Sequence, residues 1–192
     1  MVSLELLSSL DGLLWLQSGT KVGTLFQQHQ TTVSRNQKKC SRVFDITLYK
    51  HNKKWSVDGD QTLLQLERKV HQAARLQGKS RLRIEANEWL DSPHFNPPPL
   101  GWIVGSGNNL NDPYGIQCLK KYIIDACLCP ISYIPTESQD LTIIPINTSI
   151  EVSFVVLRQY ANQARISELI NILKLTQITN NRKESWRVIL SR

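Results

Sequence analysis

The chain has 192 residues, of which 41% are hydrophobic and 20% charged, so it can bury a core and is not a disordered polypeptide. Its net charge of +7 is uneven: residues 1–80 hold twelve Lys or Arg against six Asp or Glu, whereas residues 81–192 hold eleven against ten. No apolar run reaches the roughly 18 residues of a membrane span, and the N-terminal stretch lacks the basic start of a signal peptide. We therefore expect a cytoplasmic chain with no membrane partner.

Three helices are predicted at the N-terminus. Leucines at near-helical spacing predict the first helix over about residues 4–16. The Ser18-Gly19 pair is expected to end this helix, because glycine readily adopts the left-handed conformation. Thr20 would cap a short second helix over residues 21–27. A third helix follows over about residues 31–44.

A hairpin and a long helix are predicted next. Residues 45–57 alternate roughly between polar and apolar on either side of Lys50–Lys54, where Asn52 suits a turn, so they predict a two-stranded hairpin with a basic tip. Asp58 can cap a helix over about residues 59–77.

The apolar positions of this long helix are spaced by three, four and three residues, as in a short coiled-coil seam. They are Leu63, Leu66, Val70 and Ala73. The alternative is an ordinary amphipathic helix whose apolar face packs on its own domain.

The second half alternates predicted strands and helices, which indicates an α/β domain. Strands are predicted over 82–86, 100–104, 131–134, 141–146 and 150–157, and helices over 116–126 and 164–175. Residues 92–99 and 108–112 are expected to be irregular, and 180–192 can add a terminal strand.

Catalytic and metal-binding patterns are weak. Cys40, Cys118, Cys127 and Cys129 have no paired metal-ligand spacing, and the last two lie on an apolar run that favours packing. The glycines around Ser106 form an incomplete phosphate-binding pattern. We therefore expect no catalytic residues, no metal and no cofactor.

Residues 13–59 resemble the DNA-binding domain of the LysR-type transcriptional regulators. Three motifs carry the resemblance in order and spacing: Gln30–Arg35 (QTTVSR), Thr47–Lys50 (TLYK) and Trp55–Gly59 (WSVDG). They resemble the start of the recognition helix, the entry of the wing, and its exit toward the linker helix. Gly23 and Thr24 depart from the paired alanines usual in the family.

The resemblance implies three parts: a winged helix-turn-helix over 1–58, a linker and dimerisation helix over 59–78, and a small α/β regulatory or interaction domain over 81–192. The last part resembles one lobe of a periplasmic-binding-protein-like effector domain. Only about 112 residues remain for it, so we expect the second lobe, and with it the usual effector pocket, to be missing or reduced.

The leading turn of the third helix carries short or forked hydrogen-bonding groups that suit base edges. These residues are Gln30, Thr31, Thr32, Ser34 and Arg35. Basic residues around them suit phosphates. They are Lys21, Lys38, Lys39 and Arg42, with Lys50, Lys53 and Lys54 on the wing. The plainer alternative is a set of exposed, solvated helix residues.

The sequence thus predicts a regulator that acts as a dimer on double-stranded DNA at an inverted repeat, and that forms a homodimer or a higher homo-oligomer. A different class stays open: a protein-interaction or adaptor module that keeps the helix-turn-helix scaffold, has a protein partner and does not bind specific DNA.

Overall fold

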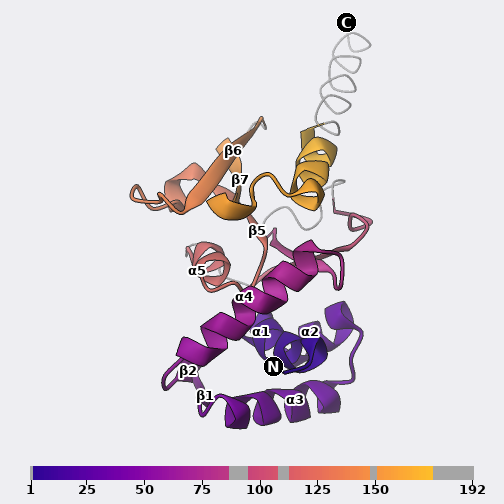
Figure 1. The fold of residues 1–192 in the computed structure, drawn as a ribbon, viewed down its shortest axis with the longest axis vertical. Coiled ribbons are helices and arrows are strands. Elements are labelled where there is room, and N and C mark those ends of the chain that lie inside the picture. The colour runs from indigo at the N-terminus through magenta and orange to yellow at the C-terminus, as the bar shows by residue number, and fades with distance from the viewer. Residues whose placement is uncertain (1, 87–94, 108–112, 148–150, 175–192) are drawn as a thin grey trace, which may run out of the picture.

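The computed structural model describes residues 2–86, 95–107, 113–147 and 151–174. Three helices and a hairpin form one end of the molecule, a long helix crosses the middle, and a mixed β-sheet forms the other end (Figure 1). Across those ranges no helix has both the length and the apolar character that crossing a bilayer requires.

The first two helices each begin after a serine whose side chain accepts a backbone N–H of the first turn. Helix α1 spans Leu4–Leu16, and the Ser3 hydroxyl accepts the backbone N–H of Leu6 at 3.2 Å. It ends at Gln17, which takes the left-handed conformation (φ 58°), and not at Gly19 as expected. Helix α2 spans Gly19–Phe26, and its cap is Ser18, not Thr20, because the Ser18 hydroxyl accepts from Lys21 N.

Helix α3 spans Gln30–Val43 and follows α2 after a tight turn. Gly23 permits this turn, because a Cβ there would lie 2.8 Å from the carbonyl oxygen of Gln28. The helix buries Val33 and Cys40 against α1, while Asn36 donates to the Ser9 hydroxyl at 3.1 Å. These contacts fix the angle between the two helices.

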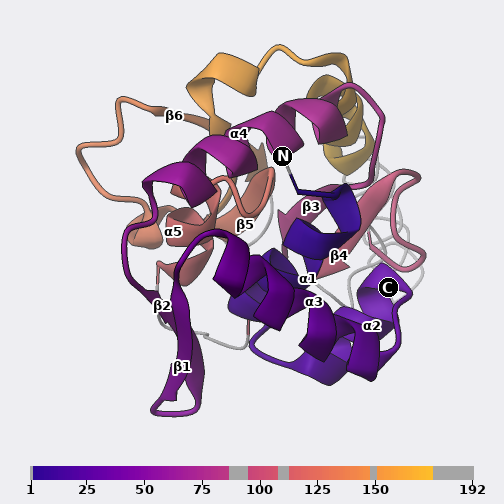
Figure 2. The same ribbon diagram turned by 60° about the horizontal axis from the view of Figure 1, so that its bottom comes forward.

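The predicted hairpin is present. Strands β1 (Thr47–His51) and β2 (Lys54–Asp58) pair antiparallel. Asn52 and Lys53 both have positive φ, 48° and 64°, which is the type I′ turn that matches strand twist in a two-residue hairpin. With the three helices, this hairpin completes a winged helix-turn-helix fold (Figure 2).

Helix α4 spans Thr62–Leu76 and therefore starts later than expected. Gly59 has a φ of 104°, which does not continue into a helix. The carboxylate of Asp60 accepts the backbone N–H of Thr62 at 2.9 Å, so Asp60 and not Asp58 satisfies a free donor at the helix start.

The second half contains a single sheet of five strands within the described residues, in the order β4-β3-β5-β7-β6. The strands are β3 (Leu82–Glu85), β4 (Trp102–Gly105), β5 (Ala126–Pro130), β6 (Leu141–Asn147) and β7 (Glu151–Leu157). β3 pairs parallel with β4 and β5, and β7 pairs antiparallel with β5 and β6.

Alternate residues of the strands enter two cores, one on each face of the sheet. Ile103, Cys127 and Val155 pack in one core with α1 and with α5 (Tyr114–Lys120). Val104, Leu128 and Phe154 pack in the other, which the helical residues 164–174 cover. Helix α1 thus belongs to the winged helix-turn-helix and to the core of the sheet at once.

The close approach of α1 to the sheet depends on Gly105. A Cβ at this position would lie 2.7 Å from Leu16 Cδ2 and 2.8 Å from the indole carbon Cζ2 of Trp15. Leu16 and Trp15 are both fully buried, so little space remains there for a larger residue.

Three expectations for the second half are wrong. The helix predicted over 116–126 stops at Lys120, because Tyr122 adopts a left-handed conformation (φ 60°) and residues from Ala126 form β5. Residues Ile131–Tyr133 form a 3₁₀ turn after Pro130 in place of a strand. Leu100 is fully exposed, and its strand begins at Trp102. The turn expected at 108–112 and the terminal strand expected over 180–192 lie outside the described residues.

Candidate nucleic-acid interface

One face of α3 is open to solvent at the end of the molecule (Figure 2). Thr31, Arg35, Lys38 and Arg42 follow one another at intervals of four, three and four residues, and all four are exposed. The buried residues Val33 and Cys40 lie on the opposite face. The helix therefore presents a polar and basic stripe while its apolar side holds it to the core.

The five residues expected to contact bases do not have equal access. Gln30, Thr31 and Arg35 are exposed, whereas Thr32 and Ser34 are half-buried at the edges of the stripe. We call these five residues the recognition surface. Gln30 and Arg35 are exposed and have the longest side chains of the five, so they have the greatest reach toward a ligand.

A hollow of about 450 Å³ lies between α3, the α1–α2 turn and the hairpin. Gln30, Ser34 and Gln37 line it from α3, and Lys50 lines it from β1. Residues that the sequence placed in separate motifs, the recognition helix and the wing, therefore border one concave surface.

The basic residues expected to contact phosphates surround this surface. Lys38, Lys39 and Arg42 are exposed on α3, and Lys50, Lys53 and Lys54 are exposed on the hairpin. Lys21 is half-buried on α2. Between Thr20 and Lys54 the sequence has one acidic residue, Asp45, so the positive charge is scarcely offset locally.

The hairpin is fixed to the body of the molecule by Gln17. Its amide oxygen accepts the backbone N–H of Trp55, and its amide nitrogen donates to the hydroxyl of Tyr114 at 2.6 Å. Lys50 Nζ lies 5.6 Å from the centre of the Trp55 ring, a cation–π distance. Gln17 therefore sets the position of the wing relative to α5 and the sheet.

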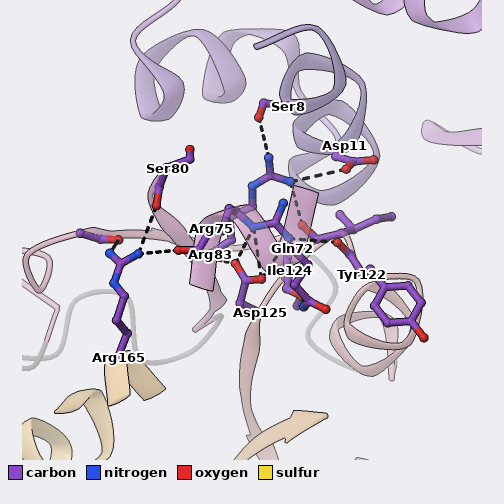
Figure 3. A network of polar contacts seen from close by, with 12 residues as sticks. Ser8, Asp11, Gln72, Arg75, Ser80, Arg83, Tyr122, Ile124, Asp125 and Arg165 are labelled. Carbon is purple, nitrogen blue, oxygen red and sulfur yellow. Dashed lines mark hydrogen bonds and ion pairs between the residues drawn. The ribbon is translucent and has the colours of Figure 1, made fainter. Parts of the chain in front are cut away.

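Buried ion pairs connect α1, α4 and the sheet. Figure 3 shows those of Arg75 and Arg83. The guanidinium of Arg75 on α4 makes hydrogen bonds of 2.8 and 3.0 Å to the two carboxylate oxygens of Asp125. Asp125 also accepts the backbone N–H of Arg83 at 2.8 Å. This two-point pairing anchors α4 against the start of β5.

The side chain of Arg83, on β3, contacts helix α1. It donates to the hydroxyl of Ser8 on α1 at 2.7 Å and lies 3.6 Å from the carboxylate of Asp11 (Figure 3). Burial lowers the pKa of Arg83 to about 9, so its guanidinium remains charged at neutral pH. The winged helix-turn-helix is thereby held to the sheet by a fully buried cation.

The apolar stripe of α4 faces away from its own chain. Leu63, Leu66 and Val70 are 66%, 53% and 49% exposed, and Ala73 is half-buried. The helix instead turns Leu64 and polar residues, among them Arg68 and Arg75, toward the molecule. An amphipathic helix that packs its apolar face on its own domain would show the reverse pattern.

Metal-binding side chains do not converge in the described part of the chain. No group of three or more His, Cys, Asp or Glu side chains is placed there to hold an ion. All four cysteines are buried and free, and burial raises the pKa of both Cys40 and Cys118 to about 12. These two thiols are therefore protonated at neutral pH.

Sequence reasoning missed the residues that position the interface. Gln17 and Tyr114 are 97 positions apart, and Arg83 and Ser8 are 75 apart. A hydrogen bond between such distant residues leaves no periodic signal in the sequence. The left-handed residue at the end of α1 is also a glutamine, and glutamine is not among the usual residues for that conformation.

The fold combines a winged helix-turn-helix, a connecting helix and an α/β sheet. Solved structures of LysR-type regulators are similar to this chain. A full-length OxyR variant from Pseudomonas aeruginosa matches 76% of this chain and 53% of its own, at 15% identity and a TM-score of 0.43. The oxidized form of Corynebacterium glutamicum OxyR matches 76% and 51%, at 12% identity and a TM-score of 0.35.

CrgA, a LysR-type transcriptional regulator from Neisseria meningitidis, matches 77% of this chain and 54% of its own, at 11% identity and a TM-score of 0.31. The present chain thus spans about half the length of the solved structures that it matches. No protein-family model matches the chain, and no curated protein matches it.

Proposed function

We propose that this protein is a non-enzymatic transcriptional regulator of the cytoplasm that binds double-stranded DNA sequence-specifically. One observation carries the proposal: the exposed face of α3 joins hydrogen-bonding residues at its start to basic residues beyond, next to a lysine-tipped hairpin. A helix enters the major groove of B-DNA with its leading turn at base edges, and a basic hairpin can then contact the flanking backbone.

Side-chain chemistry assigns base contacts and phosphate contacts to different residues. Arg35 can donate two hydrogen bonds to guanine, and Gln30 can both donate to and accept from adenine, so these two residues carry base preference. Thr31, Thr32 and Ser34 complete the recognition surface. Lys38, Lys39, Arg42, Lys50, Lys53, Lys54 and Lys21 contact phosphates, which fixes the register of the protein on the duplex but carries no sequence information.

We also propose that two copies of the chain form a homodimer through α4. Its stripe of Leu63, Leu66, Val70 and Ala73 has coiled-coil spacing, and the first three are about half exposed or more. Burying them against a second copy removes this apolar surface from water. Two-fold pairing would place two recognition helices about one DNA turn, roughly 34 Å, or a multiple of it apart, so the site is an inverted repeat.

Regulation by a ligand held between two lobes does not suit this architecture. The described residues after α4 form one sheet with a helix layer on each face, and a cleft between lobes requires two walls. We therefore propose that the usual two-lobed pocket is missing or reduced.

Selection of bound duplexes from a random pool, followed by footprinting, tests the proposal. We expect enrichment of an inverted repeat whose half-sites are protected one helical turn, or a multiple of it, apart. An interaction module without DNA binding would enrich no sequence. As a control, a variant with Arg35, Lys38 and Lys39 changed to alanine removes exposed groups only, so it should fold normally and enrich nothing.

A further inference from the structure

A second cavity lies between the hairpin, the start of α4 and helix α5. Its volume is about 260 Å³, a little below the range of about 300–1,000 Å³ common for small-molecule sites. In Figure 2 the base of β2, the first turns of α4 and α5 lie together on one side of the molecule. The cavity is separate from the hollow beside the recognition surface, although Trp55 borders both.

Arg68 provides a buried cation in the wall of this cavity. It is 1% exposed, and its Nε donates to the carboxylate of Asp11 at 2.7 Å. Its Nη2 is also buried and has no hydrogen-bond partner among the described residues. An unsatisfied guanidinium nitrogen is costly, because it has lost its hydration without gaining an acceptor.

The charge around Arg68 favours an anion. Asp11 is shared between two guanidiniums, at 2.7 Å from Arg68 and 3.6 Å from Arg83, so one carboxylate serves two cations. Lys121 adds a third positive charge at the exposed rim, and none of the residues that line the cavity is an Asp or a Glu. Burial raises the pKa of the Cys118 thiol in the wall to about 12, so it contributes no competing negative charge.

The rest of the lining is mixed. Leu14 and Ile123 supply buried apolar surface, and Val57 adds a half-buried side chain. Gln61 and Gln117 add amide groups that can donate and accept hydrogen bonds. Polar surface exceeds apolar surface in this lining, and the buried Leu14 and Ile123 give it a smaller apolar part. The lining therefore suits a molecule with one anionic end, polar contacts around it and one small apolar part, in preference to an inorganic ion.

We propose that this cavity binds a small organic carboxylate whose carboxylate group pairs with Arg68 and whose apolar part packs on Leu14 and Ile123. A carboxylate supplies the acceptor that Arg68 Nη2 lacks, with the planar geometry that a guanidinium matches. Because Nη2 is closed to solvent, and Asp11 Oδ2 beside it is also without a hydrogen-bond partner, the ligand has to displace the Arg68 side chain slightly toward the cavity. The hairpin forms one wall, through Tyr49 and the residues from Trp55 to Val57. Binding therefore restrains the wing against α5. The inference does not depend on DNA binding.

Calorimetric titration with phenylacetate tests the inference. We expect saturable binding of one molecule per chain, and no saturable binding of phenylacetamide, which has the same shape without the charge. Absence of saturable phenylacetate binding would overturn the proposal. Saturable binding of inorganic phosphate without phenylacetate would overturn the assignment to an organic carboxylate.

Two neighbouring lysines supply a matched pair of variants. Lys121 lines the cavity, whereas Lys120 lies outside it and pairs with Asp140 at 3.2 Å. Lys121→Gln should weaken phenylacetate binding about threefold, the loss expected for one partly exposed charge, and Lys120→Gln should leave it unchanged. Equal effects of the two substitutions would contradict the assigned site.

Arg68→Lys retains a charge for Asp11 but loses the planar fork, so it should weaken binding about tenfold. Its urea unfolding midpoint shows whether the fold is intact. Hydrogen exchange on the unaltered protein gives a second measurement that needs no substitution. Phenylacetate should slow exchange in β2 and α5, and protection confined to other segments would refute the location.

Discussion

The indole N–H of Trp15 donates to the carboxylate of Glu85 at 2.7 Å, and both side chains are buried. Trp15 lies on α1 of the winged helix-turn-helix and Glu85 on β3 of the sheet. Glu85 also accepts the backbone N–H of Gly107 at 3.0 Å. One carboxylate thereby ties the winged helix-turn-helix end of the molecule to the sheet, and the two halves should unfold together.

Trp15→Phe should therefore destabilise the whole chain. The substitution removes one hydrogen bond to the charged Glu85 carboxylate, which keeps the bond from Gly107, at a cost of about 1.5–3 kcal/mol beyond the loss of ring size. Trp102→Phe is the control, because Trp102 is also buried but its indole has no hydrogen bond within the described residues. Urea unfolding followed by circular dichroism should show the larger loss for Trp15→Phe, and equal losses would contradict a stabilising role for the hydrogen bond.

The buried pair of Arg75 and Asp125 gives a second prediction. Asp125→Ala leaves a guanidinium unpaired in the interior and should cost about 3–5 kcal/mol. Asp140→Ala breaks the ion pair with Lys120. The Asp140 side chain is 52% exposed and that of Lys120 is 36% exposed, so the loss should cost about 0–1 kcal/mol. Free energies of unfolding from urea titrations compare the two, and similar values would show that Asp125 does not anchor α4.

Stability should fall as the solution becomes mildly acidic, because of His71. Burial is the largest cause that lowers the pKa of His71, and Arg75 acts in the same direction, whereas Glu67 and Asp11 oppose them. In the unfolded chain a histidine titrates near pH 6.5. Below about that pH the unfolded state binds more protons than the folded state, so stability declines as the pH falls toward the folded pKa.

Urea midpoints between neutral pH and about pH 5 check this expectation. His71→Gln should reduce the decline, because it removes the titrating group. His51→Gln, at the exposed tip of the hairpin, should leave the decline unchanged. A decline of the same size in all three proteins would assign the effect to other groups.

Oligomeric state tests the outward stripe of α4. Leu66→Glu places a charge in the proposed seam and should convert a dimer to a monomer in analytical ultracentrifugation, while the monomer remains folded because Leu66 is 53% exposed. Gln65→Glu adds the same charge one position away, where the residue lies outside the stripe. A monomeric wild-type protein at all concentrations would refute the dimer.

Much of the N-terminal half could be predicted from sequence because its signals are local. Leucine spacing predicted α1, and the polar and basic residues around Asn52 predicted the hairpin, whose type I′ turn needs only two residues of positive φ. The motif from Gln30 to Arg35 placed the start of α3 within one residue.

The second half was predicted less well because tertiary contacts override local pattern. Ile123 and Ala126 continue the helical spacing of Ile116 and Leu119, yet the left-handed Tyr122 ends α5 and Ala126 starts a buried strand. A strand buried on both faces is continuously apolar, so it cannot be told from a buried helix by periodicity. The burial of Arg68, Arg75 and Arg83 was likewise unpredictable, since their guanidiniums pair with carboxylates 50 or more positions away.

Duplex binding by variants of α3 and the hairpin tests the central claim most directly. Fluorescence anisotropy across a salt series would compare wild-type, Arg35→Ala and Lys53→Ala proteins on a selected duplex and on a scrambled one. Wild-type affinity should fall steeply with salt, with a slope of about −0.9 for each phosphate contact. Arg35→Ala should erase most of the preference between the duplexes, at about 1–3 kcal/mol, whereas Lys53→Ala should weaken both equally and reduce the slope by about one. A flat salt dependence, or unchanged preference in Arg35→Ala, would contradict the account.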